Sequence, residues 1–470
     1  RTLRSARPRF LFPESAPREA RMASAPALAG RWTLVQPEFR PMVGDLAHPS
    51  VRYSACTVLH AGQLVVTHGY FYNHDKRQPA WQSDAWAYSL SEQTWRRVHQ
   101  GEKYGAPSAR YSASAVVHDG SLYMFGGDDG GHKRSMNNYV FKSWFDELWR
   151  LDLASYTWRA IKPVGVSSLP HKRALHSAVV VDGAMYVYGG IERSDTWRFD
   201  FSANAWTMVD RGSKDVARHS HPGARHAHAA APSPRGGAFF IFGGSARAEE
   251  GSKVIALDDL WMFETATSKW RRLVTPPGTG EPPQPWGLAP TLRSHASLTV
   301  ASSSALLLYG GAHCTPGCRC FGEAWVYELG LGESAGRWLR VNASGQVPVH
   351  RYRHSLVRDA SDGAFYLFGG ESYKPYMYHN ALERLEVVGL ASTGNLATMA
   401  PPIGGETSSS TSFPVGAAAA GVGIGLFAFW LLRKLCCAPR EPLRCIHRHA
   451  YRVFALPCLS LEIMHWCRAL

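Results

Sequence analysis

Short apolar runs separated by turn residues recur along the chain, and the stretch from Arg173 to Trp206 shows the pattern most clearly. Apolar residues fill 178–181 and 185–188, an Asp-Gly pair lies between these runs, and a glycine pair ends the second. Two further short runs follow before and after a second polar turn. Runs of this length bounded by Asp-Gly and Gly-Gly are typical of β-strands. The stretch therefore predicts four strands joined by an Asp-Gly hairpin, a longer loop and a second tight turn.

The same markers return in constant order in six units. An arginine opens each unit, a glycine pair ends the second strand, an acid two residues before a tryptophan begins the third, and another tryptophan marks the fourth. The arginines are Arg52, Arg110, Arg173, Arg225, Arg293 and Arg353. The first unit has His68-Gly69 as its pair, and the others have Gly126-Gly127, Gly189-Gly190, Gly243-Gly244, Gly310-Gly311 and Gly369-Gly370. The acid–tryptophan markers are Asp84/Trp86, Glu147/Trp149, Asp195/Trp197, Asp259/Trp261 and Glu323/Trp325, and the fourth-strand tryptophans are Trp95, Trp158, Trp206, Trp270 and Trp338. Four strands in about 35–45 residues is the size of one propeller blade.

These markers resemble the kelch repeat over roughly residues 31–388. The resemblance implies an all-β fold, a six-bladed kelch-type β-propeller. Blades packed radially bury the sheet faces that a single sheet leaves exposed. We expect the glycine pairs to lie closely under a neighbouring tryptophan. The sixth unit has no fourth-strand tryptophan, so we predict that the N-terminal strand around Trp32 pairs into it and closes the ring.

Outside the propeller the composition changes. Residues 1–30 are rich in Arg, Pro, Ala and Ser and predict a disordered leader. Residues 389–413 are rich in Gly, Ala, Ser, Thr and Pro and predict a flexible stalk. Residues 414–432 have no charged side chain, and this length matches a membrane span.

The segment after the predicted span sets the expected topology. Residues 433–470 form a basic, cysteine-containing tail that begins with Arg433-Lys434. By the positive-inside rule this tail is cytosolic, and the propeller is extracellular or lumenal. The sequence therefore predicts a single-pass membrane protein. Gly421 and Gly425 in the span are spaced as in helix pairs that approach closely, which makes a homodimer through this helix possible.

Cysteine and asparagine residues suggest covalent modifications. Cys314, Cys318 and Cys320 share one loop with His313, and we favour a local disulfide over a metal site or free thiols, because the spacing lacks paired two-residue gaps. Cys436 and Cys437, next to the predicted span, are acylation candidates. Asn342 begins the single Asn-x-Ser/Thr sequence and is expected in a surface loop, where it is a glycosylation candidate.

Loops between the second and third strands vary most and emerge on one face of a propeller. They gather aromatic and basic residues, and long loops on a rigid scaffold are common binding sites. The predicted ligand-binding face consists of Tyr72, Arg77, Trp81, Lys133, Arg134, Tyr139, Trp144, Tyr373, Tyr376 and His379.

Several functions lack support in the sequence. The +14 charge of the chain is concentrated at its ends, so the propeller is only mildly basic and no nucleic-acid partner is expected. No phosphate loop, nucleophile elbow or His-Glu-x-x-His motif occurs, so we expect no enzyme, cofactor or metal. The histidines that recur at blade starts are expected to be structural: His176, His226, His228, His295 and His354.

The architecture resembles that of attractin-like kelch membrane proteins. It predicts a membrane-anchored module that binds an unknown protein or glycan through the loop face. The alternative is an intracellular kelch scaffold anchored to an organelle. A galactose-oxidase-like enzyme is a third hypothesis, although nothing in the sequence singles out the cysteine and tyrosine of such a cofactor.

Overall fold

The computed structural model describes most of the propeller and none of the chain after Leu390. The described residues are 27–38, 47–73, 78–130, 134–135, 138–139, 144–164, 168–213, 220–247, 254–274, 289–314, 317–330 and 336–390. The predicted membrane span and tail, with Cys436 and Cys437, lie outside them, as do the predicted stalk after Leu390 and nearly all of the predicted leader. Within the described ranges no helix is long and apolar enough to cross a membrane.

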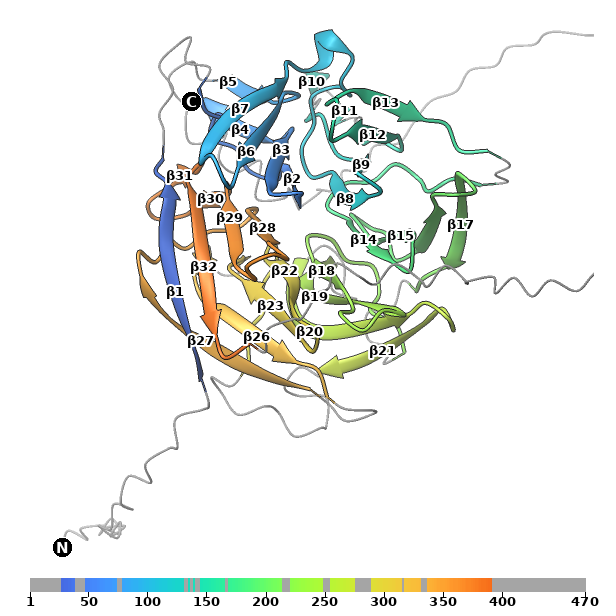
Figure 1. The fold of residues 1–470 in the computed structure, drawn as a ribbon. Helices are drawn as coiled ribbons and strands as arrows, with labels where there is room; N and C mark the ends of the chain where they lie inside the picture. Colours follow the sequence, from blue (N-terminus) through green and yellow to red (C-terminus); the bar gives the residue numbers. More distant parts are fainter. Residues whose placement is uncertain are drawn as a thin grey trace, which may run out of the picture. The chain divides into compact units, whose positions relative to one another are not determined.

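Six blades of four antiparallel strands each surround a common axis, as the repeat predicted, and blades five and six are joined into one eight-stranded sheet (Figure 1). Blade one consists of β2 (Cys56–His60), β3 (Gln63–Thr67), β6 (Ala85–Ser89) and β7 (Thr94–His99). Blade two consists of β8 (Ser114–His118), β9 (Ser121–Phe125), β12 (Leu148–Asp152) and β13 (Trp158–Ile161). Blade three consists of β14 (Ser177–Val181), β15 (Ala184–Tyr188), β16 (Thr196–Asp200) and β17 (Ala205–Asp210). Blade four consists of β18 (Ala229–Pro232), β19 (Ala238–Arg247), β20 (Val254–Glu264) and β21 (Lys269–Val274). Blade five consists of β22 (Ser297–Ser302), β23 (Ala305–Tyr309), β26 (Ala324–Glu328) and β27 (Arg337–Gly345). Blade six consists of β28 (Ser355–Arg358), β29 (Phe365–Phe368), β32 (Leu382–Val388) and β1 (Ala27–Gln36).

The second strand of each blade shows why the sequence repeat contains uninterrupted runs of apolar residues. In β15 and β23 every residue is buried. A strand that has other blades on both faces has no solvent side, so its sequence loses the alternation of apolar and polar residues. Outer strands such as β7 keep exposed positions.

The N-terminal strand closes the ring, as predicted. β1 pairs antiparallel with β32, and Trp32 lies opposite Leu385. The Trp32 side chain is 1% exposed and packs on Tyr309 of blade five. Because β1 already begins at Ala27, the predicted leader of residues 1–30 was too long by four residues.

The same strand makes a second contact that the sequence did not suggest. β1 also pairs in parallel with β27, from Ala27 opposite Arg340 to Trp32 opposite Gly345. Asn342 lies in this ladder opposite Ala29, so its predicted position in a surface loop was wrong. Its side chain is exposed, and the hydroxyl of Ser344 donates to the carbonyl oxygen of Gly30 at 3.0 Å. One strand therefore covers the outer edges of two blades.

The opening arginines and the acids of the third strands are partners. Each arginine is buried and pairs with the acid of its own blade, and one of its nitrogens also donates to the carbonyl at the glycine pair. The pairs are Arg52–Asp84, Arg110–Glu147, Arg173–Asp195, Arg225–Asp259, Arg293–Glu323 and Arg351–Glu383, with N···O distances from 2.6 to 2.9 Å. In blade six the opener is thus Arg351, and the prediction of Arg353 was wrong by two residues.

The glycine pairs approach the next blade, although not its tryptophan as expected. A Cβ on Gly126 would lie 2.6 Å from the carbonyl oxygen of Arg173 and 2.8 Å from the His176 ring. The second glycine of each pair donates its N–H to the carbonyl of the arginine that opens the following blade, at 2.9–3.0 Å in all six cases. The glycines therefore fix the backbones of adjacent blades against each other.

A second set of hydrogen bonds circles the axis. The residue two positions after each arginine has φ between 49° and 58°, and its N–H donates to the carbonyl of its counterpart in the preceding blade at 2.7–3.1 Å. These residues are Ser54, Ser112, Leu175, Ala227, His295 and Arg353. A left-handed backbone is costly outside glycine, and the closed ring supplies the constraint that holds it. Arg353 belongs to this ring.

Candidate functional site

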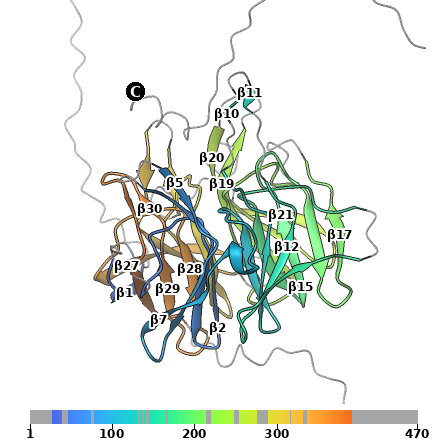
Figure 2. The same ribbon diagram turned by 90° about the horizontal axis from the view of Figure 1, so that it is seen from above.

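One end of the propeller, here called the loop face, carries extra hairpins. They follow the glycine pairs as β4–β5 (Tyr70–Asn73 and Gln78–Trp81), β10–β11 (Arg134–Ser135 and Asn138–Tyr139), β24–β25 (Ala312–His313 and Arg319–Cys320) and β30–β31 (Glu371–Ser372 and Met377–Tyr378). In blade four, β19 and β20 themselves continue past the glycine pair and stay paired, so they form the extra hairpin there. Figure 2 shows β5, β10, β11, β30 and the ends of β19 and β20 toward one side of the propeller. The sequence analysis predicted that the most variable loops, those between the second and third strands, lie on this face.

Where the hairpins begin, the residue after each arginine meets the residue after each second glycine. We call these twelve residues the rim. In five blades the two form an isolated β-bridge. The bridges are Tyr53–Tyr70, Tyr111–Asp128, His226–Ser245, Ser294–Ala312 and Tyr352–Glu371. In blade three the corresponding residues are Ala174 and Ile191.

The rim has two chemically different sides. On blades six, one and two, which we call the tyrosine side, four of its six residues are tyrosines. The rings of Tyr53, Tyr70 and Tyr111 contact one another with centroids 5.2–6.2 Å apart. Trp81 packs on Tyr70, and Tyr378 stacks on Tyr53. On blades three to five the rim residues are small or aliphatic apart from His226. The tyrosine side is therefore a continuous cluster of aromatic rings from three blades. Tyr53 is buried in it, and Tyr70, Trp81, Tyr111 and Tyr378 are half-buried.

A polar network borders these rings. The guanidinium of Arg353 lies 4.9 Å from the centroid of the Tyr53 ring and pairs with the buried carboxylate of Glu371 at 3.1 Å. The hydroxyl of Tyr376 donates to the other oxygen of Glu371 at 3.3 Å and lies 2.7 Å from the hydroxyl of Tyr378. Burial raises the pKa of Tyr378 to about 12, so its hydroxyl stays protonated at neutral pH. The network fixes the rings and offers phenolic hydrogen-bonding groups at the surface.

Several residues of the predicted binding face belong to this site. Trp81 and Tyr376 contact the aromatic cluster, and Tyr376 is 43% exposed. Tyr72 and Tyr373 lie half-buried in the hairpins β4–β5 and β30–β31. Trp144 donates its ring N–H to Asp128 of the rim at 3.2 Å.

The other predicted residues are outside the site or outside the described residues. His379 is fully buried and contacts Glu38, so its prediction as a binding residue was wrong. It lies between β31 and β32, where its backbone N–H donates to the carbonyl of Gly370 at 2.9 Å. Arg134 and Tyr139 pair across β10–β11, and Arg77 and Lys133 lie outside the described residues.

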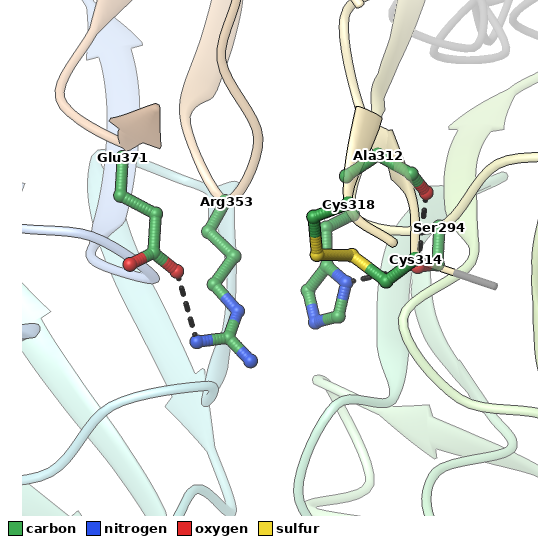
Figure 3. The surroundings of a disulfide bond; sticks show 7 residues. Ser294, Ala312, Cys314, Cys318, Arg353 and Glu371 are labelled. Atoms are coloured by element: carbon green, nitrogen blue, oxygen red, sulfur yellow. Dashed lines mark hydrogen bonds and ion pairs between the residues drawn. A yellow bond between two sulfur atoms is a disulfide. The ribbon is translucent and has the colours of Figure 1, made fainter. Parts of the chain in front are cut away.

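The cysteine loop belongs to blade five and lies beside the polar network, which belongs to blade six. A disulfide joins Cys314 to Cys318 at the tip of β24–β25, and Cys320 is free (Figure 3). Figure 3 also shows Arg353 directed toward Glu371 in the neighbouring blade. Burial raises the pKa of Cys320 to about 11, which keeps this thiol protonated and weakly nucleophilic. Among the described residues no three His, Cys, Asp or Glu side chains are placed to hold a metal ion.

The recurring histidines lie between blades. His176 and His228 each contact a serine of the preceding blade, Ser114 at 2.8 Å and Ser177 at 2.7 Å. Burial, with the nearby Arg173, lowers the pKa of His176 to about 3, so it is neutral in the folded protein. His354 has the same low value, for which burial is again the main cause. These side chains pack the blades together.

Sequence reasoning missed Tyr53, Tyr111 and Tyr352 as site residues. They directly follow the opening arginines, and they were not among the residues predicted for the binding face. The signal was present, because this position is aromatic in only three of the six units. An aromatic residue that a repeat does not require at a given position suggests a role outside the scaffold.

Comparisons with known proteins agree with this geometry. Residues 30–229 match the KLHDC2/KLHL20/DRC7 Kelch-repeats domain, and residues 191–387 match the Attractin/LZTR1 beta-propeller. The solved structure titled "Structure of YjhT" is similar over 75% of this chain and 99% of its own, with a TM-score of 0.50 and 14% sequence identity. At that identity the likeness shows the fold alone.

Two curated relatives cover different shares of the chain. The Leucine-zipper-like transcriptional regulator 1 homolog of Drosophila melanogaster is 33% identical over 127 residues, which is 25% of this chain and 12% of that protein. Kelch domain-containing protein 2 of Bos taurus is 24% identical over 375 residues, 73% of this chain and 82% of the relative. The family models, these relatives and the repeated arginine–acid pairs agree, and residues 30–387 of the chain belong to the kelch-repeat β-propeller family.

Proposed function

We propose that the tyrosine side of the loop face binds a segment of a partner protein. The observation that carries this proposal is the continuous cluster of aromatic rings from three blades, whose half-buried members Tyr70, Trp81, Tyr111 and Tyr378 surround the buried Tyr53. Aromatic rings held rigid by a scaffold supply contact area at little cost in conformational entropy. A glycan would also stack on such rings, and a glycan ligand is an outcome of the test below.

Site-specific photocrosslinking in cells tests this proposal. A photoreactive amino acid replaces Tyr376, which is 43% exposed on the loop face, or Met208, which is 40% exposed on outer strand β17. We expect discrete protein adducts from position 376 and none of them from position 208. The double variant Tyr70→Ala/Tyr376→Ala, carrying the crosslinker at Tyr373, should lose these adducts. Equal adducts from both positions, or a partner released by glycosidase treatment, would overturn the proposal.

We further propose that residues 414–432 anchor the propeller in a membrane with the loop face outside the cytosol. The uncharged segment, the basic residues after it and the Cys314–Cys318 disulfide support this topology, because disulfides persist in oxidising compartments. Protease added to sealed microsomes should spare the propeller and remove the tail. Digestion of the propeller instead would favour the alternative, a scaffold anchored to an organelle and facing the cytosol. Replacing Gly421 and Gly425 by Leu tests the proposed dimer, which should weaken.

A further inference from the structure

Five aromatic rings follow one another across the loop face, from the β4–β5 hairpin of blade one to the β30–β31 hairpin of blade six. Their successive centroids lie 5.5, 5.2, 5.8 and 5.3 Å apart. We call them the aromatic row, which consists of Trp81, Tyr70, Tyr53, Tyr378 and Tyr376. All except Tyr53 are partly open to solvent, and Tyr376 is 43% exposed. A ligand from solvent can therefore contact the rings at both ends of the row.

The central ring of the row is buried between two accessible ones. Tyr53 is 7% exposed, whereas Tyr70 and Tyr378 are half-buried. These two come from hairpins of different blades, and their centroids lie 5.2 and 5.8 Å from that of Tyr53. A chain in the polyproline II conformation carries residues i and i+3 on the same side, about 9 Å apart. Two rings that both contact a third are close enough together to take both of these side chains.

The polar groups at the blade-six end of the row already have partners in the fold. Arg353 pairs with Glu371 at 3.1 Å, and the hydroxyl of Tyr376 donates to the other oxygen of this carboxylate at 3.3 Å. The hydroxyls of Tyr376 and Tyr378 lie 2.7 Å apart. A charged group of a ligand placed here would lose water without gaining an unpaired counterion. The row therefore favours a neutral ligand that gains its affinity from packing.

Proline meets this requirement better than other residues do. A backbone N–H of the ligand that is buried against the rings without an acceptor costs free energy. Proline has no N–H, and proline-rich chains pack on surfaces lined by aromatic rings. Such a chain is already extended before it binds, so it loses little conformational entropy on binding.

We propose that the partner segment is a neutral, proline-rich stretch in the polyproline II conformation. Two prolines three residues apart pack on Tyr70 and Tyr378, and the continuation of the segment contacts Tyr376 or Trp81. This inference rests on the proposed function and adds to it the chemistry of the ligand and the spacing of its contacts.

The first test uses the full chain and peptides of defined sequence. An array presents neutral peptides with prolines three residues apart, copies in which alanine replaces these prolines, and acidic and basic peptides without proline. We expect the array to select the proline peptides, and the tightest of them, labelled with fluorescein, becomes the probe. Alanine at either proline should weaken binding by about tenfold. Raising the salt concentration from about 0.1 M to about 1 M should change the affinity by less than about twofold, because no ion pair forms.

Variants of the chain locate the peptide. Tyr70→Ala and Tyr378→Ala should each weaken binding of the probe by about tenfold. Tyr376→Ala changes a side chain that is 43% exposed, so it keeps the test available if the other two variants do not fold, and it should weaken binding by about threefold. The control Tyr104→Ala removes a tyrosine that is 63% exposed and lies outside the row, and it should bind as the wild type does. Lys374→Asn removes the exposed cation of the β30–β31 hairpin and should also leave binding unchanged.

The outcomes separate this inference from the proposed function. If no peptide binds, if the alanine copies bind as well as the proline peptides, or if Lys374→Asn and added salt weaken binding, the proline inference is wrong. Protein adducts from position 376 whose crosslinked segment contains no proline would overturn the same inference and leave the proposed function standing. If the row variants bind the probe as Tyr104→Ala does and position 376 yields no adducts, both proposals fail.

Discussion

Individual buried side chains make the stability of this propeller depend on pH. Burial lowers the pKa values of His68, His176 and His354 to about 3 in the folded chain, against an ordinary value near 6.5. Below pH 6.5 the unfolded chain takes up protons at these rings that the folded chain does not. Stability is therefore full above pH 6.5 and is lost as the pH falls toward 3.

The expected loss is measurable by urea titration. Between pH 7 and pH 5.5 each of these histidines should lower the free energy of unfolding by roughly 1 kcal/mol. His176→Gln should flatten the pH dependence by about one proton, because one such site is removed. An identical slope in this variant would show that the ring is protonated inside the fold.

The buried ion pair in blade six should contribute more to the free energy of unfolding than an exposed ion pair does. The Arg351 and Glu383 side chains are 1% and 6% exposed, so Arg351→Met leaves a carboxylate buried without its cation. We expect a loss of about 3–5 kcal/mol in the free energy of unfolding. Arg340→Met removes a pair with Glu323 in which the arginine is 57% exposed, and should cost about 1 kcal/mol or less.

A double variant checks the cause. Arg351→Met/Glu383→Leu removes both charges and should recover part of the stability lost in Arg351→Met. If the double variant is no more stable than the single one, the loss comes from packing and not from the stranded carboxylate.

At the scale of elements, β1 should contribute more to the free energy of unfolding than its ten residues suggest. It fills the outer edge of blade six, covers the edge of blade five and buries Trp32 between them. Trp32→Ala should lower the free energy of unfolding by about 3–5 kcal/mol. Leu34→Ala on the same strand, where the side chain is 38% exposed, should have a small effect. Deleting residues 31–37 should destabilise all six blades, and an unchanged melting temperature after this deletion would contradict the role of β1.

The sequence was sufficient for the strands and their order, because each blade repeats local markers. The arginine, the acid, the glycine pair and the tryptophans all lie within one unit, and so does the arginine–acid contact that they form. The parallel pairing of β1 with β27 was not predictable in this way, since it joins residues more than 300 positions apart with no charged or aromatic pair at the contact. The rim was missed for a related reason: Tyr53, Tyr70 and Tyr378 come from different units and meet only in the ring.

At the scale of the whole molecule, the blades should unfold together. Repeats in an open array contact only their neighbours and can unfold from the ends. Here both sets of inter-blade backbone hydrogen bonds pass through all six blades and return to the first. We expect one transition in urea, with coincident midpoints by tryptophan fluorescence and circular dichroism. A chain ended after residue 347 loses blade six and should show no cooperative transition, whereas a chain ended after residue 390 should keep it. Separate transitions in the longer chain would mean that blades are independent.

The two closed circuits of hydrogen bonds also restrict how such a protein changes its length over generations. In each circuit every blade donates to one neighbour and accepts from the other, always in the same sense. A gene that gains or loses one repeat by recombination encodes a chain in which both circuits must open and close again at a new circumference. We therefore expect the number of blades to change rarely, and only by complete repeats. Variation is left to the hairpins of the loop face, where residues change without touching either circuit.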